Sequence, residues 1–322
     1  MSNAYTNYNQ SVFINRTKLK GVTAVDGSFQ IQTKPINILG LGSVNQVVAD
    51  IPQANFSITR DIAFVDLFQK YTGLNESLLG SINYGNAVFG FNEGYLTSYS
   101  YSVEYGQTPI STLGITVYGD MGSGATSAAS IRFETGLNAT GDVQDQVNKI
   151  TRPSDITISC YGSETNRVKS FSFDVGIEKH AIYGLGNVNP VQVSTKYPLT
   201  VNTSFTIEVD NYNSRRINDY LTSLSGFDSF SINVKGIVYD PIGLEMNGQQ
   251  IELPGGTEIN FLGNNGYSVS QIWNFNSSNT KLISQDISSS AEDITQVKLN
   301  YVTYLNAPRN SRFDTVAFPS VG

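Results

Sequence analysis

Charged side chains are scarce in this sequence of 322 residues: Asp, Glu, Lys and Arg together make up 15% of it, against about 25% in an average soluble protein. The balance is acidic, with 27 acidic and 20 basic residues and a formal net charge of −7. A protein that grips nucleic acid regardless of sequence needs a basic excess, so the composition excludes that class. Aromatic and β-branched residues are plentiful, which excludes an intrinsically disordered chain.

The sequence has one cysteine, Cys160, and one histidine, His180. A single cysteine cannot form an intrachain disulfide, and a single histidine excludes a histidine-based metal cluster and leaves a Ser-His-Asp triad dependent on one residue. We interpret Cys160 as a small core residue of a strand and His180 as a neutral histidine at a strand edge or turn. The sequence therefore predicts no catalytic residues, no cofactor-binding residues, no cofactor and no metal ligands, and hence no enzyme.

Weaker candidate sites have simpler explanations. Segments 40–45 and 184–189 begin like a dinucleotide fingerprint but lack its third glycine and its helix, so we interpret them as turns. The Gly-rich segment 122–127 lacks the lysine of a phosphate-binding loop. A carboxylate pair for glycoside hydrolysis stays open, because its separation is a spatial quantity. A set of four polar residues could in principle bind calcium, but their spacing does not fit an EF-hand, and we interpret the segment as a polar turn. These residues are Asp210, Asn211, Asn213 and Asp219.

Long apolar runs are also absent. No stretch approaches the roughly 20 apolar residues of a membrane span. The N-terminal segment lacks the basic start and apolar run of a secretory signal. We therefore expect that the protein is made in a cytosol, is not exported and does not associate with a membrane.

What the sequence does contain is alternation of apolar and polar residues, which predicts strands with one face on a core and one face toward water. Turn pairs such as Asp26-Gly27 separate the strands. Short helices are expected near 62–71, 143–150 and 215–224, and segment 119–130 is expected to lack regular structure. The predicted fold is mainly β, with tandem β-sandwich or barrel units and short flanking helices. The clearest strands are 56–58, 156–160, 204–209, 230–234 and 297–302.

Three windows of the sequence recur at a constant spacing and resemble one another. They are 26–42 (DGSFQIQTKPINILGLG), 98–114 (SYSYSVEYGQTPISTLG) and 170–186 (SFSFDVGIEKHAIYGLG). Four columns are invariant, a fifth is always aromatic and a sixth is always β-branched. Strands 156–160 and 230–234 correspond in the same way at a similar spacing. We infer an internal repeat of about 72 residues, built as strand, turn, strand, short helix and strand.

This repeat divides the chain into five segments. They are an N-terminal arm (1–26), three repeat units (27–96, 97–168 and 169–240) and a C-terminal β region (241–322), for which a degenerate fourth unit stays an open question.

The segments 98–114 and 170–186 resemble parts of tailed-bacteriophage virion proteins, in particular tail-tube and tube-like proteins. The resemblance implies a β-barrel with a flanking helix that stacks as rings around the DNA channel, with a duplicated domain in some members. It implies a homo-oligomer (a trimeric or hexameric ring), contacts with other virion proteins, assembly in the host cytoplasm, and DNA that passes without sequence-specific binding. A repeat unit is smaller than a tube domain, so two units would form one barrel. If the fourth unit is real, the chain holds two such domains, and three chains would give a pseudo-sixfold ring.

The sequence thus favours a non-enzymatic virion structural protein, with a tail tube protein as the first hypothesis. A phage neck, connector or capsid-surface protein is the alternative within the same class. A carbohydrate-binding adhesin or glycan-active β protein is the alternative from another class.

Overall fold

The computed structural model describes fourteen ranges of the chain, and every regular element in them is a β-strand, which confirms the mainly β fold class. The three expected helices fall, except for Ile62, outside the described residues. These residues are 10–15, 17–19, 21–31, 33–37, 44–49, 53–62, 76–84, 87–123, 156–160, 163–187, 189–209, 228–239, 267–290 and 293–306.

The strands form two successive groups, here called the first copy and the second copy. The first copy consists of β1 (Gln10–Ile14), β2 (Thr17–Lys18), β3 (Val22–Gln30), β4 (Thr33–Asn37), β5 (Val44–Ala49), β6 (Gln53–Asp61), β7 (Leu78–Tyr84), β8 (Ala87–Glu104) and β9 (Ile110–Val117). The short strand β10 (Met121–Ser123) follows it and pairs with the start of β8. The second copy consists of β11 (Ile156–Cys160), β12 (Ser163–Thr165), β13 (Val168–Gly176), β14 (Lys179–Ile182), β15 (Gln192–Thr195), β16 (Leu199–Glu208), β17 (Asp228–Tyr239), β18 (Tyr267–Ser290) and β19 (Asp293–Leu305).

Both copies have the same strand order. The first runs β3-β6-β9-β8 and continues from β8 through β7 to β1 and β2, and the second runs β13-β16-β19-β18 and continues through β17 to β11 and β12. The hairpin β4–β5 lies between β3 and β6 in the chain, as β14–β15 lies between β13 and β16. β3 begins at Val22 and β13 begins at Val168, and β1, β2, β4 and β6 precede their counterparts by the same interval.

Irregularities of the ladders recur at equivalent places and fix the equivalence residue by residue. The interval between equivalent residues is larger for β8 and β9 than for β3, because more residues separate β16 from β18 than separate β6 from β8. A β-bulge is a local feature that families preserve, and three shifts in register coincide between the two copies. They are Val22/Ala24 with Val168/Ser170, Leu78/Gly80 with Asp228/Phe230, and Leu96/Ser98 with Leu282/Ser284.

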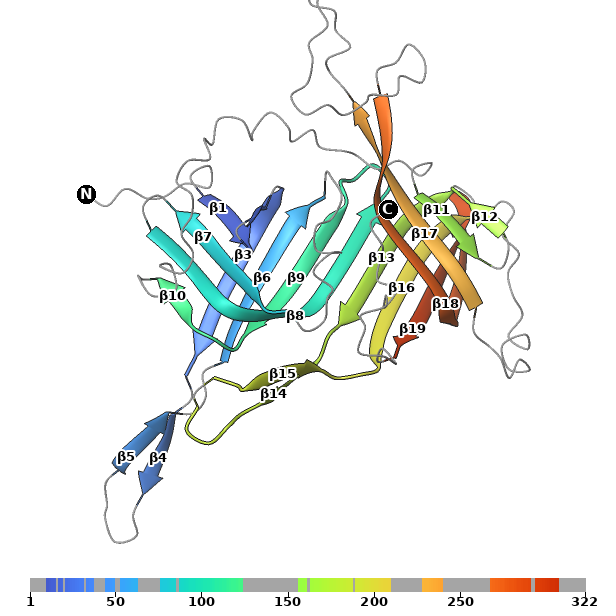
Figure 1. Ribbon diagram of the computed structural model, residues 1–322. Helices are drawn as coiled ribbons and strands as arrows, with labels where there is room; N and C mark the ends of the chain where they lie inside the picture. Colours follow the sequence, from blue (N-terminus) through green and yellow to red (C-terminus); the bar gives the residue numbers. More distant parts are fainter. Residues whose placement is uncertain are drawn as a thin grey trace, which may run out of the picture.

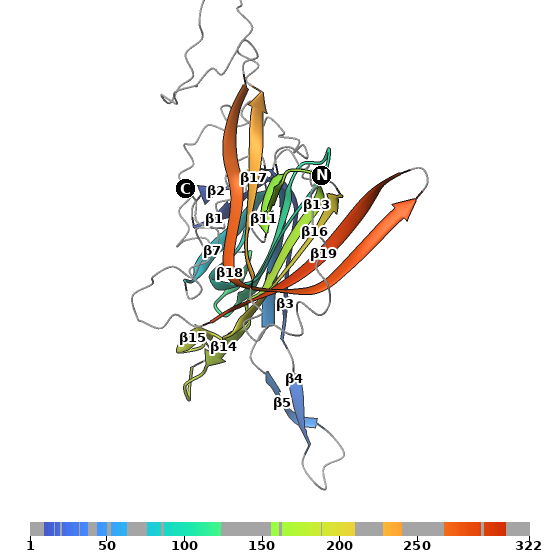
Figure 2. The same ribbon diagram turned by 90° about the vertical axis from the view of Figure 1, so that its right-hand side faces the viewer.

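Each copy folds into two layers, because the long strands β8 and β18 bend and take part in both (Figures 1 and 2). In the first copy, the start of β8 packs with β7 over β6, and the rings of Phe91 and Phe56 lie 4.8 Å apart between the layers. In the second copy, Phe275 of β18 meets Phe173 of β13 at 5.0 Å. The ends of β8 and β18 remain in the other layer. β8 pairs there with β13, so this layer runs through both copies as β3-β6-β9-β8-β13-β16-β19-β18 and is called the long layer below.

The similarity among the three sequence windows has two different origins. Windows 26–42 and 170–186 begin in β3 and β13, which hold equivalent places in the two copies, although the windows lie two residues out of the register that the ladders give. Window 98–114 lies in β8 and β9 and has a different place. β8 is instead the antiparallel neighbour of β13, with Tyr101 opposite Phe173. Neighbouring strands that bury one face on the same core need the same alternation, so they resemble each other without being copies.

The same holds for the strands 156–160 and 230–234. These are β11 and part of β17, which are antiparallel partners, with Ile156 opposite Val234. The correspondence between the two copies therefore has a longer interval in its first half, from Val22 to Val168, which is slightly more than twice the spacing of the sequence windows. Residues 10–26, placed in an N-terminal arm by the sequence interpretation, form β1, β2 and the first half of β3.

The Asp26-Gly27 pair, predicted to be a turn, lies instead in the middle of β3, and this prediction was wrong. The packing favours glycine here, because a Cβ at Gly27 would lie 2.9 Å from Met121 Cε and 2.9 Å from Phe89 Cε1, and one of these side chains would have to shift. Met121 belongs to β10, in the segment 119–130 that was expected to lack regular structure. The second copy has Phe173 at the position of Gly27. Core volume is thus supplied by different residues in the two copies.

The glycines of β7 and β8 give a test of this packing. A Cβ at Gly94 would collide with the ring of Phe91 and lie 2.8 Å from Ile115 Cγ2, and the Phe91 ring is fully buried. Overpacking of this kind costs about 1–3 kcal/mol. We expect Gly94→Ala to lower the free energy of unfolding by that amount in urea denaturation. Gly122→Ala in β10, where a Cβ meets no atom within 4 Å, is the control and should be neutral. Equal effects of both substitutions would contradict the packing described.

Candidate functional site

The sequence predicted no catalytic or metal-binding residues, and the residues considered for such roles lie apart. His180 is exposed in β14, and its carbonyl oxygen accepts a hydrogen bond from Ser194 Oγ at 3.4 Å. Cys160 ends β11, where its backbone is paired with Ser163 and Phe230. Within the described ranges, no three His, Cys, Asp or Glu side chains are grouped so as to hold a metal ion. The same ranges contain no helix with the length and apolar character needed to cross a membrane.

The Gly-rich and polar segments also take simple places where they are described. Gly186 has φ of +83°, as a turn between β14 and β15 requires. Gly122 and Ser123 belong to β10, and the rest of 122–127 lies outside the described residues. Segments 40–43 and 210–219 lie outside them as well.

The structural feature most relevant to function is the junction of the two copies, called the seam below. It is the antiparallel ladder of β8 and β13, in which Ser98–Glu104 lie opposite Ser170–Gly176 in continuous register. The ladder extends at both ends, since Ile177 N–H donates to the Thr97 carbonyl at 2.7 Å and Tyr105 N–H donates to the Lys169 carbonyl at 2.8 Å. Two copies of one unit are thus joined through backbone hydrogen bonds.

Side chains close the core side of the seam. Tyr101 and Val175 are fully buried, and Ile177 is 1% exposed. The Phe173 ring lies 6.0 Å from that of Tyr99, in an edge-on arrangement. Aromatic pairs of this geometry add about 0.5–1.5 kcal/mol beyond their buried area. The opposite face of the seam carries small polar side chains, chiefly Ser100, Ser102 and Ser172.

The two outer edges of the long layer lack such a closure. Among the described strands, β3 pairs only with β6, and the second half of β18 pairs only with β19. Phe29 lies opposite buried Ala54 and therefore faces the core, yet it is 55% exposed. Ile287 lies opposite buried Val297 and is 61% exposed. Within the described part of the chain, each edge therefore presents backbone groups that pair with no strand, together with apolar side chains at the rim of the core.

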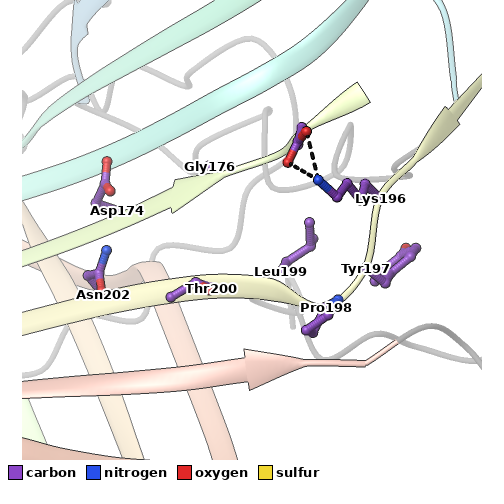
Figure 3. Close-up of a pocket in the computed structure, with 9 residues that line it drawn as sticks. Asp174, Gly176, Lys196, Tyr197, Pro198, Leu199, Thr200 and Asn202 are labelled. Carbon is purple, nitrogen blue, oxygen red and sulfur yellow. Dashed lines mark hydrogen bonds and ion pairs between the residues drawn. The ribbon is translucent and has the colours of Figure 1, made fainter. Parts of the chain in front are cut away.

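A pocket of about 390 Å³ lies where the β14–β15 hairpin leaves the long layer (Figure 3). Glu178 and Lys196 cross the base of the hairpin as an ion pair at 3.0 Å, and both side chains are largely exposed. Asp174 of β13 and Asn202 of β16 line the far side of the pocket. An exposed ion pair of this kind contributes little to stability, and Glu178 is occupied by Lys196. The pocket thus holds two carboxylates, Glu178 in an ion pair with Lys196 and Asp174 on its far side.

Lys179 at the start of β14 lies in a different environment. Its Nζ donates a hydrogen bond to Thr195 Oγ1 at 2.8 Å and lies 5.9 Å from the centre of the Tyr95 ring in β8. Burial lowers the pKa of Lys179 from 10.5 to about 8. Tyr95 in turn meets Tyr118 edge-on at 5.8 Å, and burial raises the pKa of both phenols. These contacts fix the hairpin of the second copy against the first copy, beside the seam.

Comparison with known proteins gives matches among solved structures alone. No protein-family model matches the chain, and no curated protein does. Among solved structures, a chain from the virion of a native gene transfer agent particle aligns with 13% identity and a TM-score of 0.32, over 38% of this chain and 100% of that chain. A chain from the tail of an empty gene transfer agent particle with C6 symmetry aligns with 12% identity and a TM-score of 0.31, over the same shares of the two chains.

The partly buried ammonium of Lys179 predicts a pH-dependent effect on stability. Below about pH 8, Lys179 is charged in the folded and unfolded chain, so the full desolvation cost is present. Between about 8 and 10.5 the folded state holds fewer protons, and wild-type stability rises with pH through this group. We expect Lys179→Met to raise Tm at pH 7, and the difference from wild type to shrink at pH 9.5.

Lys196→Met is the matched control, because its ammonium is at the surface, and it should leave Tm nearly unchanged at both pH values. If Lys179→Met melted below wild type at pH 7, the contacts with Thr195 and Tyr95 would outweigh desolvation, contrary to this account.

Proposed function

We propose that this chain is a non-enzymatic structural protein of a bacteriophage virion, and more specifically a tail tube protein. In this proposal the chains associate into rings, three chains giving six copies of the unit, and the rings stack around the DNA channel. Other virion proteins bind the ends of the stack, and assembly takes place in the host cytoplasm.

The observation that carries the proposal is the seam between the copies. One copy of the unit joins the next through a ladder of backbone hydrogen bonds and a shared core. A contact between successive copies that does not pair a surface with itself is heterologous, and repeating it produces either a closed ring or a filament. The chain thus contains two successive units of an arrangement that can continue in further chains.

The polarity of the long layer supports the same function. Its face away from the core is formed mainly by serine, threonine and asparagine, with an excess of carboxylates. A polar surface with an acidic balance repels phosphates and does not hold DNA, as a channel for passing DNA requires. The acidic residues of this face are Asp26, Asp61, Glu104, Asp174, Glu208 and Asp286, and the basic residues in the described part are Lys169, Lys281 and Lys298.

The size of the ring follows from the strand count. The long layer has eight strands per chain, so three chains would supply 24. With strands about 4.8 Å apart and tilted by about 40°, such a barrel has a backbone diameter of roughly 50 Å. Barrels of more than about 16 strands leave an open channel, which agrees with a tube.

Electron microscopy of the purified protein at high concentration tests the function. We expect rings or short tubes with a central channel, and a mass in solution that is a small multiple of 35.1 kDa. His180→Ala should form the same rings, since no chemistry of the sole histidine is involved. A protein that stays monomeric at every concentration and binds a glycan would overturn the proposal in favour of an adhesin.

A further inference from the structure

We propose that the outer edge of β3 in one chain pairs with the second half of β18 in the next chain, so that residues 24–30 lie antiparallel to residues 284–290. The partner of each open edge is thus a second copy of this chain. This inference rests on the proposed function, because it names the surface through which the ring closes.

The seam supplies the template for this contact. β13 and β3 hold equivalent places in the two copies, as β18 and β8 do, and the shared ladder irregularities align each pair residue by residue. In the seam, Ser170–Gly176 of β13 lie opposite Ser98–Glu104 of β8. If β13 is replaced by its equivalent β3, and β8 by its equivalent β18, residues 24–30 of β3 lie opposite residues 284–290 of β18, in one defined register.

Burial shows that these edges are built for a partner. Val175 and Ile177 in the seam are fully or almost fully buried, whereas the equivalent Phe29 and Ile31, in and just after β3, are 55% and 53% exposed. Tyr101 is fully buried in the seam, and the equivalent Ile287 of β18 is 61% exposed. The same positions are therefore apolar in both copies but covered in only one. Exposed edges with apolar side chains cause unspecific pairing unless they are covered.

The proposed register also matches apolar contacts and charges. It places Ile287 opposite Gly27, beside the Met121 and Phe89 side chains that lie over this glycine, and Phe29 opposite the aliphatic part of Gln285. On the polar face, Asp26 lies opposite Ser288. Asp286 lies opposite Ser28 in the same way. No two like charges therefore face each other directly, and the ladder avoids the destabilisation that such a pair would cause.

Each chain has one β3 edge and one β18 edge, and they lie at opposite ends of the long layer (Figure 1). A contact between two different edges is heterologous, so every chain can bind one neighbour on each side. The junction between chains then repeats the junction within the chain, and all units of the ring have the same kind of neighbour.

A register-specific disulfide tests the contact. In the seam, the hydrogen bonds of Ile177 to Thr97 and of Tyr105 to Lys169 put the odd-numbered residues of β8 in hydrogen-bonded pairs. Ser102 and Ser172 then form a non-hydrogen-bonded pair with Cα atoms about 4.5 Å apart, within the range of roughly 4.4–6.8 Å that a disulfide needs. The equivalent pair between chains is Asp26 with Ser288.

The experiment uses the full chain with Cys160→Ala, and introduces Asp26→Cys and Ser288→Cys together. After mild oxidation, we expect a non-reducing gel to show covalent multiples of the chain up to the ring size, all lost on reduction. Ser102→Cys with Ser172→Cys is the positive control and should form a disulfide within one chain. Gln30→Cys with Ser288→Cys is out of register and should give at least tenfold less cross-linked product.

A second variant tests the contact without cysteines. Ile287 is exposed in the single chain, so Ile287→Glu should leave the Tm of the unassociated chain unchanged and abolish self-association measured by light scattering. Ile110→Glu, at an exposed site of β9 away from both edges, should associate as wild type does. Rings that form without the Asp26–Ser288 cross-link, or that survive Ile287→Glu, would overturn this inference and leave the proposed function standing. A wild-type chain that never associates would overturn both.

Discussion

The backbone ladder between β8 and β13 is the interaction on which the rest of this structure depends. It joins two copies of a two-layer unit into one continuous layer of eight strands, and it buries the apolar rows of both strands at the junction. Without it, β8 and β13 would each be an exposed edge, as β3 and β18 now are. The seam therefore joins the two copies, and its strands β13 and β8 correspond to the strands β3 and β18 at the two open edges of the long layer.

The two copies keep their geometry while their residues differ. Strand order, hairpin positions and three ladder irregularities coincide, but the core is filled differently. Gly27 stands where the second copy has Phe173, and the space is taken by Met121 and Phe89. Cores tolerate such exchanges when the total volume is kept. The pattern of alternation, rather than residue identity, is what both copies share.

Much of the architecture could be predicted from the sequence, because alternation is a local signal. Strands such as 230–234 and 297–302 lie in β17 and β19 as expected. The interval between corresponding strands could not be predicted, since neighbouring strands on one core resemble each other as closely as corresponding strands do. The strand position of Gly27 depends on contacts with Phe89 and Met121, which lie far along the chain and outside any local pattern. The open edges became visible only once the ladder register showed which apolar positions lack a cover.

The most direct test of this account is an electron-microscopy structure of the assembled protein that resolves the strands at the junction between chains. The account predicts that β18 of one chain lies beside β3 of the next, with Ser288 opposite Asp26 as Ser102 lies opposite Ser172 in the seam. An assembly in which both edges stay uncovered, or in which β3 meets a strand other than β18, would contradict it.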